Sequence, residues 1–459
     1  MKHHHLLSTG LKILAFSLIP SAVWATQPLT EFLNAAKTHS FDAREQIATS
    51  DQRRWERGAA LGRLLPSFTA RGVYQHNQYD VQILFPGATE PVVITPQNQL
   101  DAFLQLDVPL IDIASYHRYR QAHHMAEAAD LQKELAGSEV DRAVARSYYS
   151  FLGASALVQA AEKSVANAQR NLDYVDTRRQ VGVALELDYE RARANLERTN
   201  QDLADAGLMR DLAARALQTL TGIAPQSVDV YPEDDLQGEG NLSTWLASRD
   251  TPTDKVQRKY VEAAASARRA AATALLPTLS ANAQERFTNA AGFVGRNNYY
   301  TLQAVLSWRL DYSTYATAEA QAAAADVQSV RSERARRGLE DSIYDAFRRV
   351  ETGVAKSTAA RLQAAAAAKA ARLSMDRYES GAVTQLDVTQ SQRDAFQAEA
   401  ALIQADVDLA YARALLRTAA GKPVDETHVK QRRPITDPLP IAERTEPAAP
   451  STPASGSAP

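Results

Sequence analysis

Short stretches in which apolar and polar residues alternate form the first regular pattern along the chain. Between Leu100 and Val108 the even positions are apolar, and most of the odd positions carry acids or amides. A repeat of two indicates a β-strand with one apolar and one polar face. The same pattern occurs at 67–79, 279–287 and 300–310. Strands of about 9–11 residues can span a membrane as part of a barrel, so the sequence predicts four such strands.

The polar faces of these four strands carry charged and amide side chains. They are Arg71, Gln75, Asp101, Asp107, Gln284, Arg286 and Gln303. A water-filled barrel needs a polar interior, so we expect these residues to face a lumen. Four strands cannot close a barrel, and an open sheet edge cannot face lipid. Two chains would give eight strands with a filled interior, whereas three would give twelve strands and room for water.

Long helical segments follow each pair of predicted strands. Residues 113–178 contain no proline and are rich in Ala, Glu, Gln, Arg and Leu, and residues 313–378 are similar. At 1.5 Å per residue each would form a rod of about 100 Å. Shorter helices are predicted at 186–221 and 385–420. Helices of this length must coil against one another.

The chain is internally duplicated. Gly182 recurs as Gly381, and Leu-Asp follows each glycine at the same distance, ending at Asp188 and Asp387. Leu-Leu-Pro precedes the first strand of each half, at 64–66 and 275–277. The two similar halves therefore span roughly 29–222 and 244–421. A period near 200 residues is too long for a solenoid.

These patterns divide the chain into nine predicted segments. They are a signal peptide (1–25), a helical segment (26–63), a β-hairpin (64–111), a long helix pair (112–222), an equatorial linker (223–243), a helical segment (244–274), a second β-hairpin (275–311), a second long helix pair (312–421) and a disordered tail rich in Pro and Ala (422–459). The signal peptide is indicated by an apolar run from Leu11 to Ile19 after Lys2, with Val23-Trp24-Ala25 before the expected cleavage point. A membrane anchor is the alternative, although this run is too short to span a bilayer.

Composition limits the chemistry. The chain has no cysteine, which excludes disulfides, thiolate metal sites and an acylated N-terminal cysteine. A net charge of -3 gives no reason to expect nucleic acid as a partner. No catalytic triad spacing, phosphate-binding loop or HExxH motif occurs, so we expect no enzyme, no cofactor and no metal site. His123 and His124 are adjacent on a predicted helix and cannot both face one metal.

Taken in order, these motifs resemble the TolC family of outer-membrane efflux and secretion channels, from about Leu29 to Gly421. The matching pieces are the two Leu-Leu-Pro motifs, Pro109-Leu110-Ile111-Asp112, and the two glycine turns with their Leu-Asp. The resemblance implies an α+β membrane protein that trimerises to form a 12-stranded β-barrel, continued by a periplasmic α-helical barrel. It also implies the outer membrane of a Gram-negative cell, and partnership with a periplasmic adaptor and an inner-membrane pump. The channel would be a passive exit duct for drugs, small molecules or proteins in tripartite efflux or type I secretion.

The resemblance also suggests roles for the glycine turns. In the family, the turns meet the adaptor; the matching residues are Val181, Gly182, Val183, Ser380, Gly381 and Ala382. Asp188, Asp387 and Tyr378 match residues that line or close the narrow periplasmic mouth. A basic gate residue of some members matches Val383, so the closing network must differ here. Local readings compete with these roles: each glycine would end a helix, and each aspartate would favour a helix start. Thr384 would form a capping box with Asp387.

Two other functions remain as alternatives. A periplasmic coiled-coil adaptor or scaffold that never enters the membrane would explain the long helices but not the four strands. An exported enzyme on a helical frame would need a catalytic group that the motifs do not provide.

Overall fold

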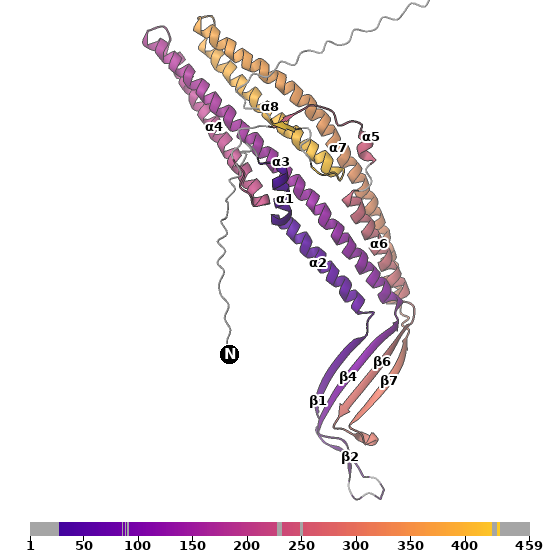
Figure 1. The fold of residues 1–459 in the computed structure, drawn as a ribbon. Coiled ribbons are helices and arrows are strands. Elements are labelled where there is room, and N and C mark those ends of the chain that lie inside the picture. The colour runs from indigo at the N-terminus through magenta and orange to yellow at the C-terminus, as the bar shows by residue number, and fades with distance from the viewer. Residues whose placement is uncertain are drawn as a thin grey trace, which may run out of the picture.

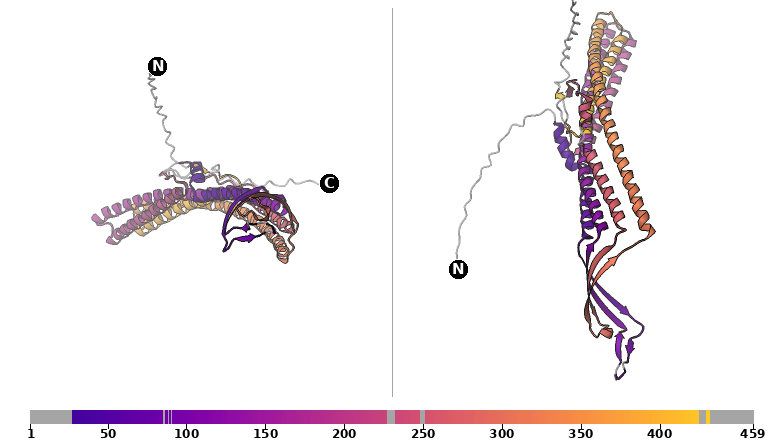
Figure 2. Two further views of the ribbon diagram at one scale, coloured as in Figure 1. Left: turned by 90° about the horizontal axis from the view of Figure 1, so that it is seen from below. Right: turned by 90° about the vertical axis from the view of Figure 1, so that its right-hand side faces the viewer.

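The structure is a computed structural model. It describes residues 27–226 apart from 85, 88 and 90, together with 232–247, 251–424 and 429–431. The signal-peptide prediction lies outside these ranges, as does most of the predicted tail. The molecule is elongated, with a four-stranded sheet at one end and two helix turns at the other (Figure 1). The helices form one curved layer, and α1 (Leu29–His39) lies on its convex side (Figure 2).

The four predicted strands form one antiparallel sheet in the order β1-β4-β6-β7. The strands are β1 (Ser67–His76), β4 (Asn98–Ile111), β6 (Thr278–Thr288) and β7 (Asn298–Ser307). The first hairpin also carries a short distal ribbon of β2 (Val81–Ile83) and β3 (Val92–Thr95). β1 and β7 are the margins of the four-stranded sheet, so among the described residues each has a strand partner on one side only.

The register separates two faces of the sheet. Directly opposed residues in an antiparallel pair share a face. Arg71 opposes Phe103, Phe103 opposes Arg286, and Gln105 opposes Gln284. Continuing this register places all seven predicted polar residues on one face. The opposite face carries exposed apolar side chains, namely Phe68, Tyr74, Leu100, Tyr300, Leu302 and Leu306.

Two helices of equal length run from the sheet to the tip. They are α3 (Ile113–Gln180) and α7 (Tyr312–Glu379), each of 68 residues. Asp112 and Asp311 cap them: each aspartate accepts a hydrogen bond from the backbone N–H three residues later. α4 (Glu186–Thr221) returns beside α3, and α8 (Gln385–Ala419) returns beside α7. The predicted duplication and the long coiled helices are confirmed.

α8 packs against both long helices. A Cβ on Gly153 of α3 would come within 2.5 Å of Val407, and one on Gly353 of α7 within 3.1 Å of Leu409. A glycine in each long helix therefore allows α8 to approach closely on both sides. None of the described helices combines the length and apolar character needed to cross a bilayer.

Shorter elements complete the body of the molecule. α2 (Phe41–Gly62) and α6 (Pro252–Thr273) pack beside α3 near the sheet. Phe32 of α1 packs on Tyr148 of α3 in the largest apolar cluster. α5 (Leu242–Leu246) covers α7, and β5 (Pro232–Asp234) pairs with β8 (Val429–Gln431), which lies within the segment predicted as tail.

A buried ion cluster fixes β5 to α8. Arg413 of α8 is 4% exposed, and its guanidinium lies 2.7 Å from both Asp234 and Glu239. It also donates to the Gln237 carbonyl. Removing one member of such a buried cluster leaves an uncompensated charge, so this contact makes the position of β5 specific.

Candidate functional site: the helix-turn tip

The two turns at the tip have the same backbone geometry. Gly182 has φ 75° and Gly381 has φ 79°, values that residues with a Cβ rarely adopt. The N–H of Val183 donates to Arg178 O at 2.9 Å, and that of Ala382 donates to Arg377 O at 2.8 Å. A Cβ would have open space at either glycine, so the requirement is one of backbone conformation and not of room. The predicted C-cap role of both glycines is confirmed.

The tip is exposed and apolar. All six predicted tip residues, Val181, Gly182, Val183, Ser380, Gly381 and Ala382, are exposed to solvent. Val181 is 70% exposed and Leu185 is 67% exposed, and Leu386 at the start of α8 is 55% exposed. These large exposed apolar side chains make the two turns a candidate contact surface.

The two aspartates after the turns have different surroundings. Asp387 completes the predicted capping box, because it accepts hydrogen bonds from the Thr384 N–H at 2.9 Å and the Thr384 hydroxyl at 2.7 Å. These hydrogen bonds hold the pKa of Asp387 below its ordinary value. Asp188 has no such cap at Leu185, and Arg191 lies 3.9 Å away. Asp188 therefore makes fewer local hydrogen bonds than Asp387, so its carboxylate is the more available of the two for other contacts.

Tyr378 lies between the two helix pairs. It is 7% exposed and packs with Val175 of α3, Ala192 of α4 and Val388 of α8. Its ring meets that of Tyr174 edge to face, with centroids 6.0 Å apart. Burial raises the pKa of Tyr378, and the nearby Asp188 carboxylate raises it further. The structure thus brings Tyr378 and Asp188 together.

Arg178 joins the two turns and was missed by the sequence reasoning. Its guanidinium donates to the Tyr378 carbonyl and to the Tyr174 hydroxyl, each at 3.2 Å. It also lies 5.6 Å from the centre of both rings. The duplication contained a usable signal, because the offset that relates the two glycines also relates Arg178 to Arg377.

The polar face of the sheet is internally bonded. Arg286 on β6 pairs with Asp101 on β4 at 2.9 Å. Asn282 donates to Asp107 at 2.5 Å. Arg71 and Arg286 both lie over the ring of Phe103, at 4.9 and 5.5 Å from its centre. Cross-strand pairs of this kind hold register, so the polar residues have a structural role as well as the predicted one.

One cluster of potential metal ligands joins α3 to α6. His124, Glu127 and Glu262 bring ligand atoms within 4.8 Å of one another. Sequence reasoning missed this cluster because Glu262 is distant in the chain. Lys259 lies 3.1 Å from Glu127 and 2.9 Å from Glu262, so its ammonium already forms an ion pair with each carboxylate. We assign the cluster to helix packing.

Comparison with known proteins relates the whole arrangement to one family. A family model described as outer membrane efflux protein matches residues 32–223 and 252–422, one stretch in each half. The CmeC outer membrane channel of Campylobacter jejuni shares 18% identity and a TM-score of 0.75, with 87% of this chain and 86% of that chain covered. The open-state MtrE outer membrane channel of Neisseria gonorrhoeae shares 19% identity and a TM-score of 0.69, covering 86% and 89%. These structures show a shared fold. Among curated proteins, no sequence match was found.

Proposed function

Because the chain belongs to the outer membrane efflux protein family, we propose that three copies form a single exit duct from the periplasm to the cell exterior. The protein is an outer-membrane efflux channel subunit, located in the outer membrane with its helices in the periplasm. The family match does not favour the adaptor alternative. Family members are channels, and we infer that this chain has no enzymatic activity of its own.

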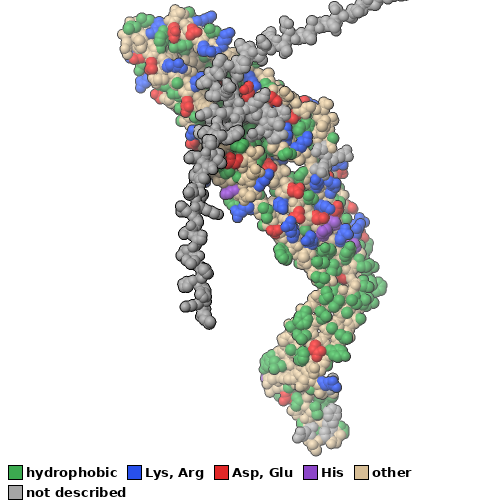
Figure 3. Space-filling view, viewed as in Figure 1, with side chains coloured by type: hydrophobic (Ala, Val, Ile, Leu, Met, Phe, Trp, Pro, Cys, Tyr) green, Lys and Arg blue, Asp and Glu red, His purple; other side chains and the backbone are tan. Residues whose placement is uncertain are grey.

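The observation that supports a trimer most directly is the open four-stranded sheet. In the part of the chain that the structure describes, β1 and β7 each leave one edge without a strand partner. In lipid every backbone N–H and C=O needs a partner, so β7 of one copy must pair with β1 of the next. Three copies give twelve strands with a polar interior, in which the seven predicted residues line the lumen. Apolar side chains gather over the sheet and the helix ends beside it, where lipid would be met (Figure 3).

Both margins of the helix layer carry exposed apolar side chains. α4 and α7 lie at opposite margins of the curved layer (Figure 1). Leu208 and Leu212 of α4 are 58% and 61% exposed, and Val327 and Val330 of α7 are 50% and 57% exposed. Rows of apolar residues on two margins are what neighbouring subunits would cover in a closed helical tunnel.

The tip would serve as both mouth and docking site. Its exposed apolar turns fit a periplasmic adaptor, which would connect the channel to an inner-membrane pump. Asp188 and Asp387 would meet their copies where the three tips converge. Arg178 and Tyr378 would keep the two turns of each subunit together and so help to close the mouth. We infer that the mouth widens when α7–α8 separates from α3–α4.

Mass measurement of the purified channel in detergent tests the assembly. We expect a trimer that fractionates with the outer membrane, dissociates on heating, and forms ion-conducting pores in planar bilayers. A conducting species that is a stable monomer or dimer would refute the proposal. Fractionation with soluble periplasmic proteins would instead favour the adaptor alternative.

A further inference from the structure

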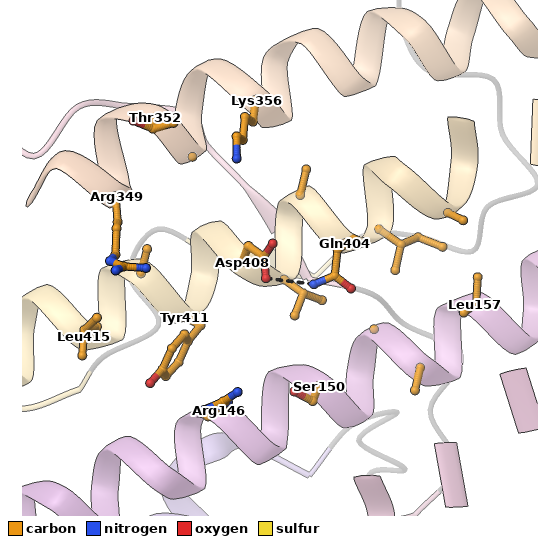
Figure 4. A pocket seen from close by; sticks show the side chains of 18 of the residues that line it. Arg146, Ser150, Leu157, Arg349, Thr352, Lys356, Gln404, Asp408, Tyr411 and Leu415 are labelled. Carbon is orange, nitrogen blue, oxygen red and sulfur yellow. Dashed lines mark hydrogen bonds between the residues drawn. The ribbon is translucent and has the colours of Figure 1, made fainter. Parts of the chain in front are cut away.

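A groove runs along α8, between α3 and α7. It has a volume of about 910 Å³. Residues of α8 form its floor, and residues of α3 and α7 form its walls (Figure 4). The two glycines that allow close helix approach, Gly153 and Gly353, both line it. The groove is therefore built into the helix packing and lies far from the tip.

The groove opens on the concave side of the molecule. Tyr148 of α3 faces α1, because its ring lies 5.7 Å from that of Phe32. α1 lies on the convex side of the helix layer (Figure 2). Arg146 and Ser150 are two residues on either side of Tyr148, which on a helix places them about 200° around the axis. They line the groove, so it faces what would be the interior of the duct.

The groove carries two cations that are not neutralised. Arg349 in its wall pairs with Asp345 at 3.0 Å, and Arg348 pairs with Glu351 at 2.7 Å. By contrast, among the residues that the structure describes, no carboxylate lies within ion-pairing distance of Arg146 or Lys356. One carboxylate on the floor, Asp408, accepts a hydrogen bond from Gln404 at 2.8 Å.

Apolar surface accompanies these charges. The Arg146 guanidinium lies 5.9 Å from the centre of the Tyr411 ring, and Tyr411 extends from α8 toward α3 (Figure 4). Leu157, Val407 and Leu415 also line the groove. Lys356 extends from α7 toward α8 (Figure 4). An aromatic face beside a guanidinium accepts a flat apolar ring, and either free cation attracts an acidic head group on its own side of the groove.

We propose that this groove is a binding site for amphipathic organic anions, namely molecules with a carboxylate or sulfonate and an aromatic or apolar body, as they pass through the duct. The inference rests on the proposed function, because it places the concave face in the conduit. The cations and the aromatic ring of the groove make the concave face selective, because they retain organic acids for longer than neutral molecules of the same shape.

The absence of native cysteine allows a direct test. Ser150→Cys places a single thiol in the groove, and Thr38→Cys, on the exposed surface of α1 at the convex side, is a control outside it. The assembled channel is treated with a methanethiosulfonate reagent carrying either a sulfonate or a quaternary ammonium group. After normalisation to Thr38→Cys, we expect about a tenfold preference for the anionic reagent in the groove. 1-Naphthalenesulfonate should slow the reaction at Ser150→Cys, and the neutral 1-naphthalenemethanol should not.

Adding Arg146→Gln and Lys356→Gln should remove both the preference and the protection. Lys356→Arg, which keeps the charge, should retain them. Equal protection by the two naphthalene compounds, or protection that survives the double substitution, would overturn the inference. Conductance of the same preparation separates the two proposals: a channel that conducts without selective protection refutes the groove alone, whereas a preparation without trimers or conductance refutes the proposed function.

Discussion

Replacing Arg178 should loosen the periplasmic mouth. Arg178→Met keeps the apolar stem of the side chain and removes the guanidinium. The lost contacts are the hydrogen bond to the Tyr378 carbonyl, the hydrogen bond to the Tyr174 hydroxyl, and the positions over both rings. Of these, the contacts with Tyr378 join the first pair of helices to the second.

The free energy that Arg178 contributes to holding the two helix pairs together follows from these contacts. A hydrogen bond from a charged donor contributes about 1.5–3 kcal/mol. A cation over an aromatic ring adds about 0.5–1 kcal/mol where it is partly exposed. Because Arg178 is only half-buried, we take the lower values and expect a loss of about 2 kcal/mol per subunit. This corresponds to roughly a thirtyfold shift toward the separated arrangement at each tip.

Arg179→Met is the matched control. Arg179 pairs with Asp176 at 2.8 Å and Glu186 at 3.0 Å, both within the first helix pair, and lies over the Tyr189 ring. It therefore makes the same kinds of contact without joining the two pairs. Single-channel recording in planar bilayers should show higher resting conductance for Arg178→Met, and wild-type conductance for Arg179→Met. If both variants conduct like wild type, or if both open equally, Arg178 is not the link between the turns.

Three further predictions concern the tip. Asp188→Asn combined with Asp387→Asn should abolish block by a trivalent cation added from the periplasmic side, since six carboxylates would meet at the mouth of a trimer; a double variant that is blocked like wild type would end the gate assignment. Gly381→Val should introduce about 1–2 kcal/mol of backbone strain at φ 79° and weaken adaptor pull-down, while leaving trimer mass unchanged; unchanged adaptor binding would contradict the docking role. Because its Thr384 hydrogen bonds hold the pKa of Asp387 below the ordinary value, the capping interaction is present above the ordinary pKa and is lost as pH falls through the lowered pKa. Protection of the first turn of α8 against hydrogen exchange, measured relative to the intrinsic rate at each pH, should therefore fall below about pH 4 in wild type. Thr384→Val should show lower protection already at neutral pH, with a weaker dependence on acid.

The repeating patterns predicted the architecture well. The two-residue alternation located β1, β4, β6 and β7, and the absence of proline from 113–178 and 313–378 located α3 and α7. Thr384 and Asp387 form the predicted capping box because such pairs depend only on residues three positions apart. Local interactions of this kind can be read directly from a sequence.

Contacts between distant segments were not predicted. The role of Arg178 depends on Tyr378, which approaches it only because two helix turns meet at the tip. The cluster of Arg413 with Asp234 and Glu239 likewise depends on the path of the chain around α8. The groove residues Arg146 and Lys356 lie on different long helices, and nothing local distinguishes them from other charged residues on solvated helix faces.

The strand order has a consequence for how the protein matures. β1 with β4 and β6 with β7 are local hairpins, but Asp101 of β4 pairs with Thr288 of β6 across the whole α3–α4 excursion and α6. Closing so long a loop costs conformational entropy, and this cost is offset only by the contacts that form when the intervening helices pack. An isolated hairpin is at best marginally stable in water. The helical body should therefore fold first and the lipid-facing sheet last. The continuous apolar face of the sheet would then form only when the chain has reached its membrane, where lipid can cover it.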